Sequence, residues 1–218
     1  MTHLTAILIG ATGATGSEIL NELLLDSTFK KLIVFSRKPL GIQDAKLENH
    51  IVNFDDIHNW AHLIQGDILF SALGTTLKDA GSSTKQYQID YTYQYEVAKE
   101  ASYNGVGTYI LISSYGANAK SLLFYSKMKG QLDEAVQQLA FSKIHIFRPG
   151  ILARQANKIR SVEKISISII NILNQLGLFK SQRPMPVSLL AQKMILVSKK
   201  ALGVKTQIYS LESIFNIE

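Results

Sequence analysis

The sequence predicts an α/β protein with a doubly wound, mostly parallel sheet and a small C-terminal lobe. Short apolar runs typical of buried strands recur along most of the chain. Segments with apolar residues at three- and four-residue spacing, typical of amphipathic helices, separate several of these runs. Strands that alternate with helices form right-handed crossovers and a parallel sheet covered on both faces. We therefore expect one domain over residues 1–218, of which about 151–218 form the lobe over the substrate.

The first expected strand, residues 4–9, leads into a glycine-rich turn and a helix over 17–25. Further strands are expected at 32–36, 51–54, 68–73, 109–113, 144–147 and 207–211, with helices at 87–103 and 122–139 between some of them. After Gly150 the pattern changes to a helix over 161–176, a break at Pro184-Met185-Pro186, a helix over 187–199 and the last strand.

The turn after the first strand has the spacing G-x-x-G-x-x-G, one residue longer than the dinucleotide fingerprint G-x-G-x-x-G. N–H groups at a helix start point into such a turn, and the helix dipole favours an anion there. Glycine removes the Cβ atoms that would hold a pyrophosphate away from the backbone. The alternative is a turn that needs glycine only for packing, but the regular spacing after the first strand favours a pyrophosphate site. Its predicted residues are Gly10, Thr12, Gly13, Ala14, Thr15 and Gly16.

The second strand ends in Ser36-Arg37-Lys38, about 20 residues after the last glycine, where an NAD-specific fold carries Asp or Glu. A carboxylate would repel the 2′-phosphate of NADP, whereas Arg37 can bind it through two charge-assisted hydrogen bonds. A solvated basic loop is the alternative. The position relative to the glycine turn favours binding of NADP(H).

The next two strand ends carry weaker signals. Asp55 could accept a hydrogen bond from the adenine amine, or simply cap a helix. Leu73, Gly74 and Thr75 lie in a small, hydroxylated stretch that permits close approach of a pyrophosphate or ribose. An ordinary turn explains that stretch nearly as well.

Candidate catalytic residues follow the fifth strand. This strand ends in Ser113-Ser114, and Tyr125 and Lys129 lie four residues apart on one face of the next helix. A nearby ammonium favours the phenolate form of tyrosine, so Tyr125 could exchange a proton with a carbonyl or alcohol oxygen. Either serine could hydrogen-bond the same oxygen. The pattern Y-x-x-x-K alone arises by chance in many helices, and its place after the other strand ends is what favours catalysis.

In combination and order, these motifs resemble the atypical short-chain dehydrogenases/reductases, in particular the small HIV-Tat-interactive-protein-type oxidoreductases. The resemblance covers the chain from the first strand to about residue 160, and more loosely the stretch that begins at Met185. The matching motifs are GATGATGS at Gly10, SRK at Ser36, LGTT at Leu73, SSYGA at Ser113, YSKMK at Tyr125 and FRPGIL at Phe147.

The resemblance implies an NADPH-binding Rossmann fold with residues 10–17 on the pyrophosphate and Arg37 on the 2′-phosphate. It implies Tyr125 as general acid/base and Lys129 as a contact of the nicotinamide ribose and the phenol. Segment 147–152 would contact the nicotinamide end through its backbone. Further implied contacts are Pro149, Leu152 and Arg160.

Two residues depart from the pattern of these relatives. Tyr115 stands where the subgroup often has lysine. Asp90 lies where many relatives carry an asparagine in a proton relay, which puts that relay in doubt.

The function that these observations predict is an NADPH-dependent oxidoreductase that moves hydride between nicotinamide and a carbonyl or alcohol substrate. An NADPH-binding regulator or redox sensor with little turnover, and an epimerase or isomerase that recycles the hydride, remain alternatives. The chain has no cysteine, so redox chemistry requires a cofactor.

Composition and charge bound the remaining properties. The net charge is +6, but the lysines are scattered, so we expect no nucleic-acid partner. There is no apolar run of ~18 residues that could span a bilayer. We expect no secretory signal at the N-terminus, and we expect a cytoplasmic monomer or homodimer. His58 and His62 lack an evident third ligand, so we expect no metal site.

Overall fold

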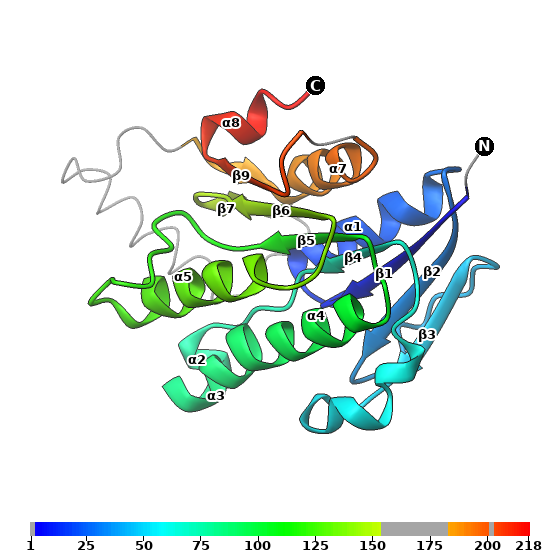
Figure 1. The fold of residues 1–218 in the computed structure, drawn as a ribbon, viewed down its shortest axis with the longest axis horizontal. Helices are drawn as coiled ribbons and strands as arrows, with labels where there is room; N and C mark the ends of the chain where they lie inside the picture. Colours follow the sequence, from blue (N-terminus) through cyan, green and yellow to red (C-terminus); the bar gives the residue numbers. More distant parts are fainter. Residues whose placement is uncertain (1–2, 154–182, 201–202) are drawn as a thin grey trace.

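A seven-stranded parallel sheet forms the centre of the computed structural model, which describes residues 3–153, 183–200 and 203–218 (Figure 1). The strand order is β3-β2-β1-β4-β5-β6-β9. The strands are β1 Leu4–Ile9, β2 Phe29–Ser36, β3 Leu47–Ile51, β4 Ile68–Ser71, β5 Thr108–Ile112, β6 Lys143–Arg148 and β9 Thr206–Ser210. Two short strands, β7 Leu152–Ala153 and β8 Met185–Pro186, pair in parallel as a separate sheet.

Helices cover both faces of the large sheet, as Figure 1 shows. α1 (Ala14–Leu25) and α7 (Val187–Ser198) pack together on one face. α4 (Tyr93–Tyr103) and α5 (Phe124–Gln137) cover the other. The shorter helices are α2 Leu77–Ala80, α3 Ser83–Tyr87 and α8 Glu212–Phe215, the 3-10 turns η1 Phe54–Asn59 and η2 Ala61–Leu63, and the π-helical turn η3 Gln88–Thr92.

Alternate residues of the central strand β1 supply two separate cores. Ala6 and Leu8 pack in the cluster that includes α1 and α7, whereas Ile7 and Ile9 pack in the cluster on the α4 and α5 side. All four are fully buried, as expected for a strand whose two faces are both covered. Because the strands are parallel, their carboxyl ends all lie along one edge of the sheet.

The predicted fold class is confirmed, with two local differences. β3 ends at Ile51, where the sequence analysis expects a strand to begin, and Phe54 instead starts η1. β3 is a half-exposed edge strand whose sequence, LENHI, lacks a continuous apolar run. The expected helix over 87–103 begins earlier, at Ser83, and contains the π-helical turn η3.

The C-terminal region contributes more to the sheet than the sequence analysis expects. β9 pairs with β6 at the end of the large sheet, and α7 packs against α1, so both belong to the main layers instead of a lobe. The expected helix over 161–176 lies outside the described residues.

Candidate active site

The glycine turn lies at the switch point of the sheet, where β1 and β4 are neighbours but their crossovers run in opposite directions. Gly10 has a φ of +86°, and a Cβ there would lie 2.4 Å from the backbone carbonyl carbon of Ala72. The turn after β1 is therefore in direct backbone contact with the residue that follows β4.

The three glycines meet different requirements. A Cβ on Gly16 would lie 2.0 Å from the Gly10 carbonyl oxygen, so packing alone requires glycine at 10 and 16. Gly13 is exposed, and the nearest atom to a Cβ there is the Gly10 oxygen at 3.3 Å. Of the three glycines, Gly13 is therefore the one whose missing side chain leaves open space on the solvent side of the turn.

The first turn of α1 presents uncompensated N–H groups. Gly13 is the N-cap, no side chain of the described residues caps this end, and the first turn contains no acidic residue. Thr12 and Gly13 are exposed and Ala14 is half-buried, while Thr15 is buried under the turn. Free N–H groups and the positive end of the dipole make this helix end suitable for an anion.

Ser36, Arg37 and Lys38 form the turn after β2. The buried Ser36 hydroxyl donates to the Lys38 carbonyl oxygen at 2.8 Å and accepts from Asn49 Nδ2 at 2.8 Å. Ser36 therefore holds the turn together, and Arg37 and Lys38 remain exposed. Arg37 is close enough to Tyr93 for its charge to act on that phenol.

The Asp55 carboxylate lies beside this turn and is already bonded. Its Oδ1 accepts from the Tyr93 hydroxyl and, at 2.6 Å, from Gln88 Nε2. Burial and the bond to Asp55 raise the pKa of Tyr93 to about 12, against the opposing charge of Arg37. Asn53, and not Asp55, caps η1 with its side chain.

The residues after β4 are tied to a buried carboxylate. The Thr75 N–H donates to Asp90 Oδ2 at 2.8 Å, and a Cβ added to the exposed Gly74 would have Asp90 Oδ1 as its nearest atom, at 3.6 Å. Gln86 Nε2 donates to the Thr75 carbonyl oxygen at 3.1 Å. Leu73 is half-buried next to the Gly10 backbone.

Lys129 pairs with this same carboxylate. Its Nζ lies 3.3 Å from Asp90 Oδ1, and the two side chains are only 3% and 1% exposed. Burial raises the pKa of Asp90, and the Lys129 ammonium and the Thr75 N–H oppose that shift. No hydrogen bond joins Lys129 to Tyr125 within the described residues.

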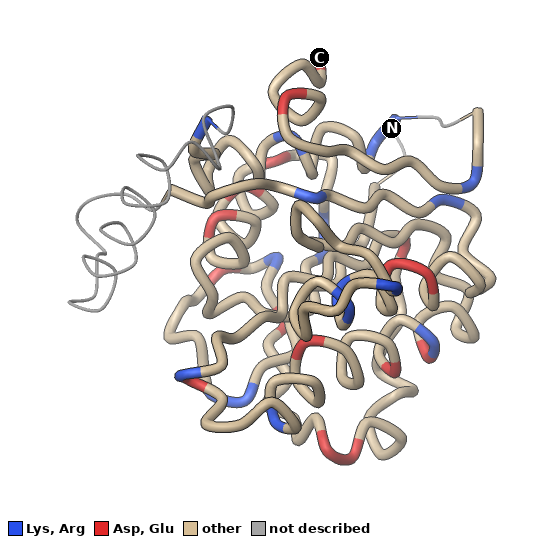
Figure 2. The backbone as a smooth tube through the Cα atoms, turned by 90° about the vertical axis from the view of Figure 1, so that its left-hand side faces the viewer, with Lys and Arg blue, Asp and Glu red and all other residues tan. Residues whose placement is uncertain are grey.

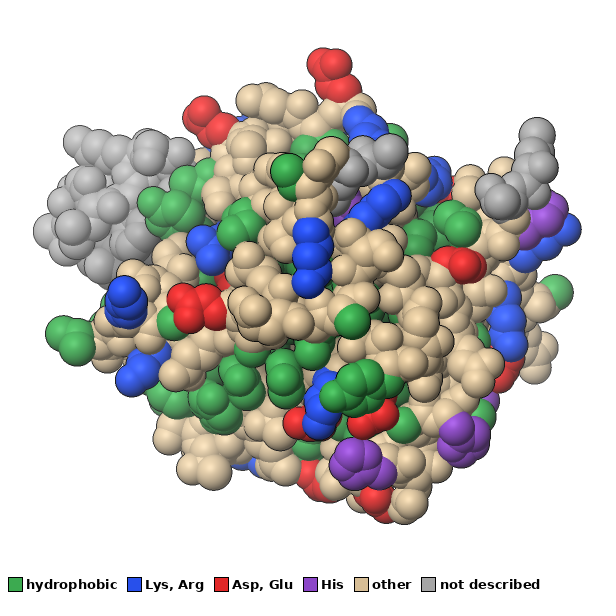
Figure 3. All heavy atoms as spheres, viewed as in Figure 1, with side chains coloured by type: hydrophobic (Ala, Val, Ile, Leu, Met, Phe, Trp, Pro, Cys, Tyr) green, Lys and Arg blue, Asp and Glu red, His purple; other side chains and the backbone are tan. Residues whose placement is uncertain are grey.

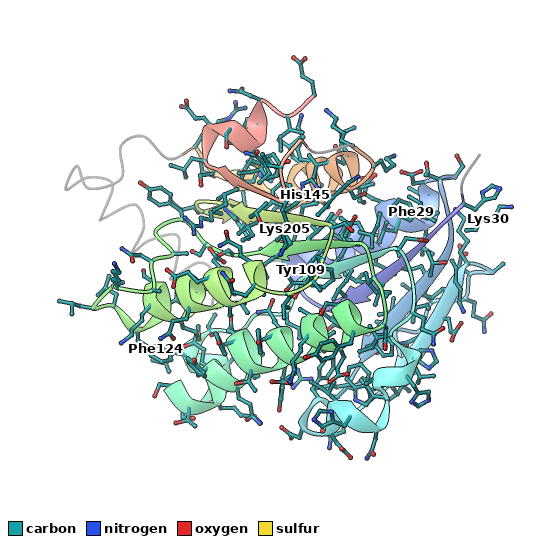
Figure 4. The ribbon with its side chains drawn as sticks, viewed as in Figure 1. Phe29, Lys30, Tyr109, Phe124, His145 and Lys205 are labelled. Atoms are coloured by element: carbon teal, nitrogen blue, oxygen red, sulfur yellow. The ribbon has the colours of Figure 1, made fainter. Side chains whose placement is uncertain are left out.

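Tyr125 lies in the first turn of α5 and is 40% exposed. The neighbouring Phe124 is also exposed, and Figure 4 places it at the outer end of the helix, far from the interior residue Tyr109. This end of α5 is fixed by the preceding loop, because the Ser126 carbonyl oxygen accepts from the Asn118 N–H at 3.0 Å.

The two serines after β5 face different environments. Ser113 is buried near the Asp133 carboxylate, yet its hydroxyl and Asp133 Oδ1 are both unpartnered among the described residues. Ser114 is half-buried, and its hydroxyl donates to the neighbouring Tyr115 carbonyl oxygen at 3.3 Å. Ser114 is the more accessible hydroxyl.

Asp133 is a buried site residue that the sequence analysis missed. Its Oδ2 accepts from Arg148 Nε at 2.8 Å, at the end of β6. Burial raises the pKa of Asp133, and Ser113, Arg148 and Lys129 oppose that shift. The available signal was spacing, since Tyr125, Lys129 and Asp133 follow one another at four-residue intervals on α5.

The segment after β6 is joined to the segment after β5. The carbonyl oxygen of the buried Pro149 accepts from the Tyr115 N–H at 2.9 Å. Leu152 lies in β7, opposite Met185, and is 36% exposed. Arg160 lies outside the described residues.

An open cavity of about 280 Å³ lies between α3 and α5, lined by Ser83, Thr84, Tyr87 and Phe124. Hydrophobic side chains also gather on the molecular face over α4 and α5 (Figure 3). The outer end of α5 is thus bordered by apolar surface.

Comparison with known proteins identifies the family. Residues 10–166 match a family model described as NAD(P)H-binding. The chain belongs to this NAD(P)H-binding family. Among similar relatives, protein FMP52-1 of Scheffersomyces stipitis is 33% identical over 78% of this chain and 77% of its own length. Protein fmp52 of Emericella nidulans is 36% identical over 73% and 71%.

Solved structures share the fold of this family member at low sequence identity. A short-chain dehydrogenase/reductase superfamily protein from Agrobacterium tumefaciens with bound NAD has a TM-score of 0.70 at 12% identity, over 95% of this chain and 77% of that one. A short chain dehydrogenase from Burkholderia cenocepacia in complex with NADP has a TM-score of 0.65 at 12% identity, over 97% and 90%. A UDP-glucose 4-epimerase from Thermotoga maritima has a TM-score of 0.67 at 12% identity, over 95% and 76%.

The relatives correct the expected location. Both FMP52 proteins are named mitochondrial, which contradicts the cytoplasmic expectation. That expectation relied on the features of a secretory signal, which do not separate cytoplasm from mitochondria. Among the described helices, none is both long and apolar enough to cross a membrane.

Proposed function

We propose that this protein is an NADPH-dependent oxidoreductase that acts on a carbonyl or alcohol substrate, with Tyr125 as the general acid/base. The observation that carries the proposal concerns the edge of the sheet where the carboxyl ends of the strands lie, because the candidate binding and catalytic groups both follow strands that end at this edge. The uncapped end of α1 lies at the switch point, and the accessible Tyr125 lies in the first turn of the helix that follows β5. Membership of the HIV-Tat-interactive-protein-type subgroup is part of the same proposal.

The binding end of the proposed site suits a dinucleotide. The open side of Gly13 and the free N–H groups of α1 can hold a pyrophosphate. Arg37 is exposed at the end of β2, where it can bind a 2′-phosphate, and no carboxylate follows this strand directly. We therefore assign NADPH, with Lys38 as a second cation and the Asp55 carboxylate beside the adenine.

At the reacting end of the proposed site, this chain supplies a proton donor and a group that binds the substrate oxygen. When bound, nicotinamide supplies or accepts the hydride. The Tyr125 hydroxyl donates its proton to the oxygen of a carbonyl during reduction, and its phenolate takes the proton back during oxidation. The accessible Ser114 is assigned to hydrogen-bond the same oxygen, while Ser113 stays against Asp133.

A regulator that binds NADPH with little turnover is the second candidate. One observation favours it: the Lys129 ammonium contacts Asp90 and not the phenol that it would activate. In this case the same cofactor site would report the cellular NADPH level.

Substitution Tyr125→Phe separates the two candidates. For an oxidoreductase we expect at least a ~100-fold loss of kcat, since general acid/base catalysis contributes roughly this much or more. NADPH binding, followed by quenching of Trp60 or by calorimetry, is expected to stay within about threefold. The activity assay is NADPH consumption across a panel of aldehydes and ketones.

The matched control is Tyr103→Phe, because Tyr103 is an exposed tyrosine at the end of α4, away from the strand carboxyl ends. It should leave turnover unchanged. Full turnover in Tyr125→Phe would contradict the catalytic role, and NADPH binding without turnover on any substrate of the panel would favour the regulator.

A further inference from the structure

Asp90 and Lys129 form an ion pair that is almost fully buried. Asp90 lies in the π-helical turn η3 and Lys129 on α5, with 3.3 Å between Nζ and Oδ1. π-helical turns are rare and often occur at functional sites. Burying two charges costs several kcal/mol unless they are paired and further bonded, and Asp90 has a second partner in the Thr75 N–H.

The charges around this pair alternate in sign. Asp133 lies one helical turn beyond Lys129, is fully buried, and is paired in turn with Arg148. Among the described residues, Asp90 from η3 and Asp133 from α5 are the charged groups that act on Lys129, and Arg148 of β6 compensates the latter. One carboxylate, Asp90, is left to balance the ammonium.

Tyr125 lies one turn from Lys129 on the opposite side from Asp133. An unbalanced ammonium one helical turn away would favour the phenolate of Tyr125. Because the Lys129 ammonium is paired with Asp90, it points toward η3 and its charge is balanced.

We propose that Asp90 is a positioning residue that holds Lys129 and balances its charge, so that Asp90 sets the pH range in which Tyr125 transfers a proton. The inference rests on the proposed function. It assigns to an aspartate a role that an asparagine of the same size cannot fill, because the amide carries no charge.

Substitution Asp90→Asn tests the role directly. With the charge removed, Lys129 favours the phenolate, and the descending limb of the pH profile of kcat/KM for carbonyl reduction should move down by about one pH unit. An unchanged limb in a folded variant would overturn the proposal. Thermal unfolding monitors the fold.

Two further variants distinguish charge balance from general damage to the site. In Asp90→Asn/Lys129→Met both charges are gone, so the limb should return to the wild-type pH even though turnover is reduced. In Asp133→Asn, a buried carboxylate that is already paired with Arg148 is removed, and the limb should move by less than half as much. A double variant that keeps the shifted limb, or an Asp133→Asn shift as large as that of Asp90→Asn, would overturn the assignment.

Ultraviolet titration provides a readout without turnover. The tyrosinate absorbance of Tyr125 is the difference between two titration curves, that of a protein with Tyr125 and that of the matching Tyr125→Phe variant. The difference is measured once in the wild-type background and once in the Asp90→Asn background. Its midpoint should be about one pH unit lower in the Asp90→Asn protein than in the wild type, as the activity limb predicts. A lower midpoint without any turnover would support the effect of Asp90 on Tyr125 and reject the proposed oxidoreductase function. Turnover with an unchanged midpoint would support the oxidoreductase function and reject the effect of Asp90.

Discussion

At the scale of single residues, Gly10, Gly13 and Gly16 illustrate how equal spacing conceals different requirements. The clash that forbids a side chain at Gly10 comes from Ala72, which follows a different strand. The sequence could predict the turn and its ligand class, but not which glycine packs and which faces the site. The same holds for Lys129, whose partner Asp90 is brought to it by the packing of η3 against α5.

Arg37→Ala tests the cofactor preference at this scale. Loss of a charge-assisted contact to the 2′-phosphate is expected to weaken NADPH binding by roughly 30-fold, equivalent to about 2 kcal/mol. NADH lacks that phosphate, so its affinity should change by less than about threefold. Calorimetric titration with both cofactors provides the measurement.

The adjacent Lys38→Ala serves as the matched control, since both side chains are exposed in the same turn. A smaller effect is expected there because lysine cannot form the bidentate contact. Equal weakening of NADPH and NADH in Arg37→Ala would contradict the assignment.

At the scale of elements, helix α5 is positioned by a glycine that the sequence analysis did not consider. A Cβ on Gly130 would lie 2.2 Å from Asn118 C and from Ala119 N. The helix therefore lies directly against the loop that leads to it, with Tyr125 one turn before this contact. The sequence predicted α5 from its apolar spacing, but a close approach between two segments leaves no periodic signal. The edge strand β3 was misplaced for a different reason, because its half-exposed sequence LENHI lacks a continuous apolar run.

Gly130→Ala is expected to destabilise the fold by about 1–3 kcal/mol, because backbone must move to admit the methyl group. Urea unfolding measures the change. Turnover should fall as well, since α5, which carries Tyr125, must move away from the loop at Gly130.

Gly107→Ala is the control for a generic effect of removing glycine. A Cβ there meets only Asp67 O, at 3.8 Å, which is an ordinary contact. If both variants lose the same stability, the close packing at Gly130 is not the cause.

At the scale of the whole molecule, some of the lysines of this basic chain bind the carbonyl ends of helices. Lys46 Nζ donates to the Leu24 carbonyl oxygen at the end of α1, at 2.8 Å, and Lys205 Nζ donates to Leu139 O beyond α5, at 2.8 Å. Lys143 Nζ donates to Lys200 O beyond α7, at 3.2 Å. Cations suit these carbonyl-rich helix ends. Figure 2 shows Lys and Arg spread over the molecule among acidic residues, in agreement with the scattered charge that the sequence predicts.

Stability is expected to fall in acid because of His145. This histidine is fully buried in β6, and burial lowers its pKa to about 4. The unfolded chain binds a proton near pH 6.5 while the folded protein does not, so stability is full above pH 6.5 and is lost as the pH falls toward 4. The loss is on the order of 3 kcal/mol. Urea unfolding between about pH 4 and pH 8 measures it.

The control is His145→Gln, which cannot take up a proton. The raised pKa values of Asp90 and Asp133 act in the opposite direction, because these carboxyls gain protons more readily in the folded state. The difference between wild type and variant isolates the histidine. Parallel curves across this pH range would show that His145 does not contribute.

The pairing of β7 with β8 brings together two segments that lie more than 30 residues apart in the sequence. Leu152 lies opposite Met185, beside the residues that follow β6. The strand order of the large sheet does not depend on this pairing, because β7 and β8 form a sheet of their own. Substitutions in β7 or β8 can therefore alter the region that follows β6 while the large sheet keeps its strand order.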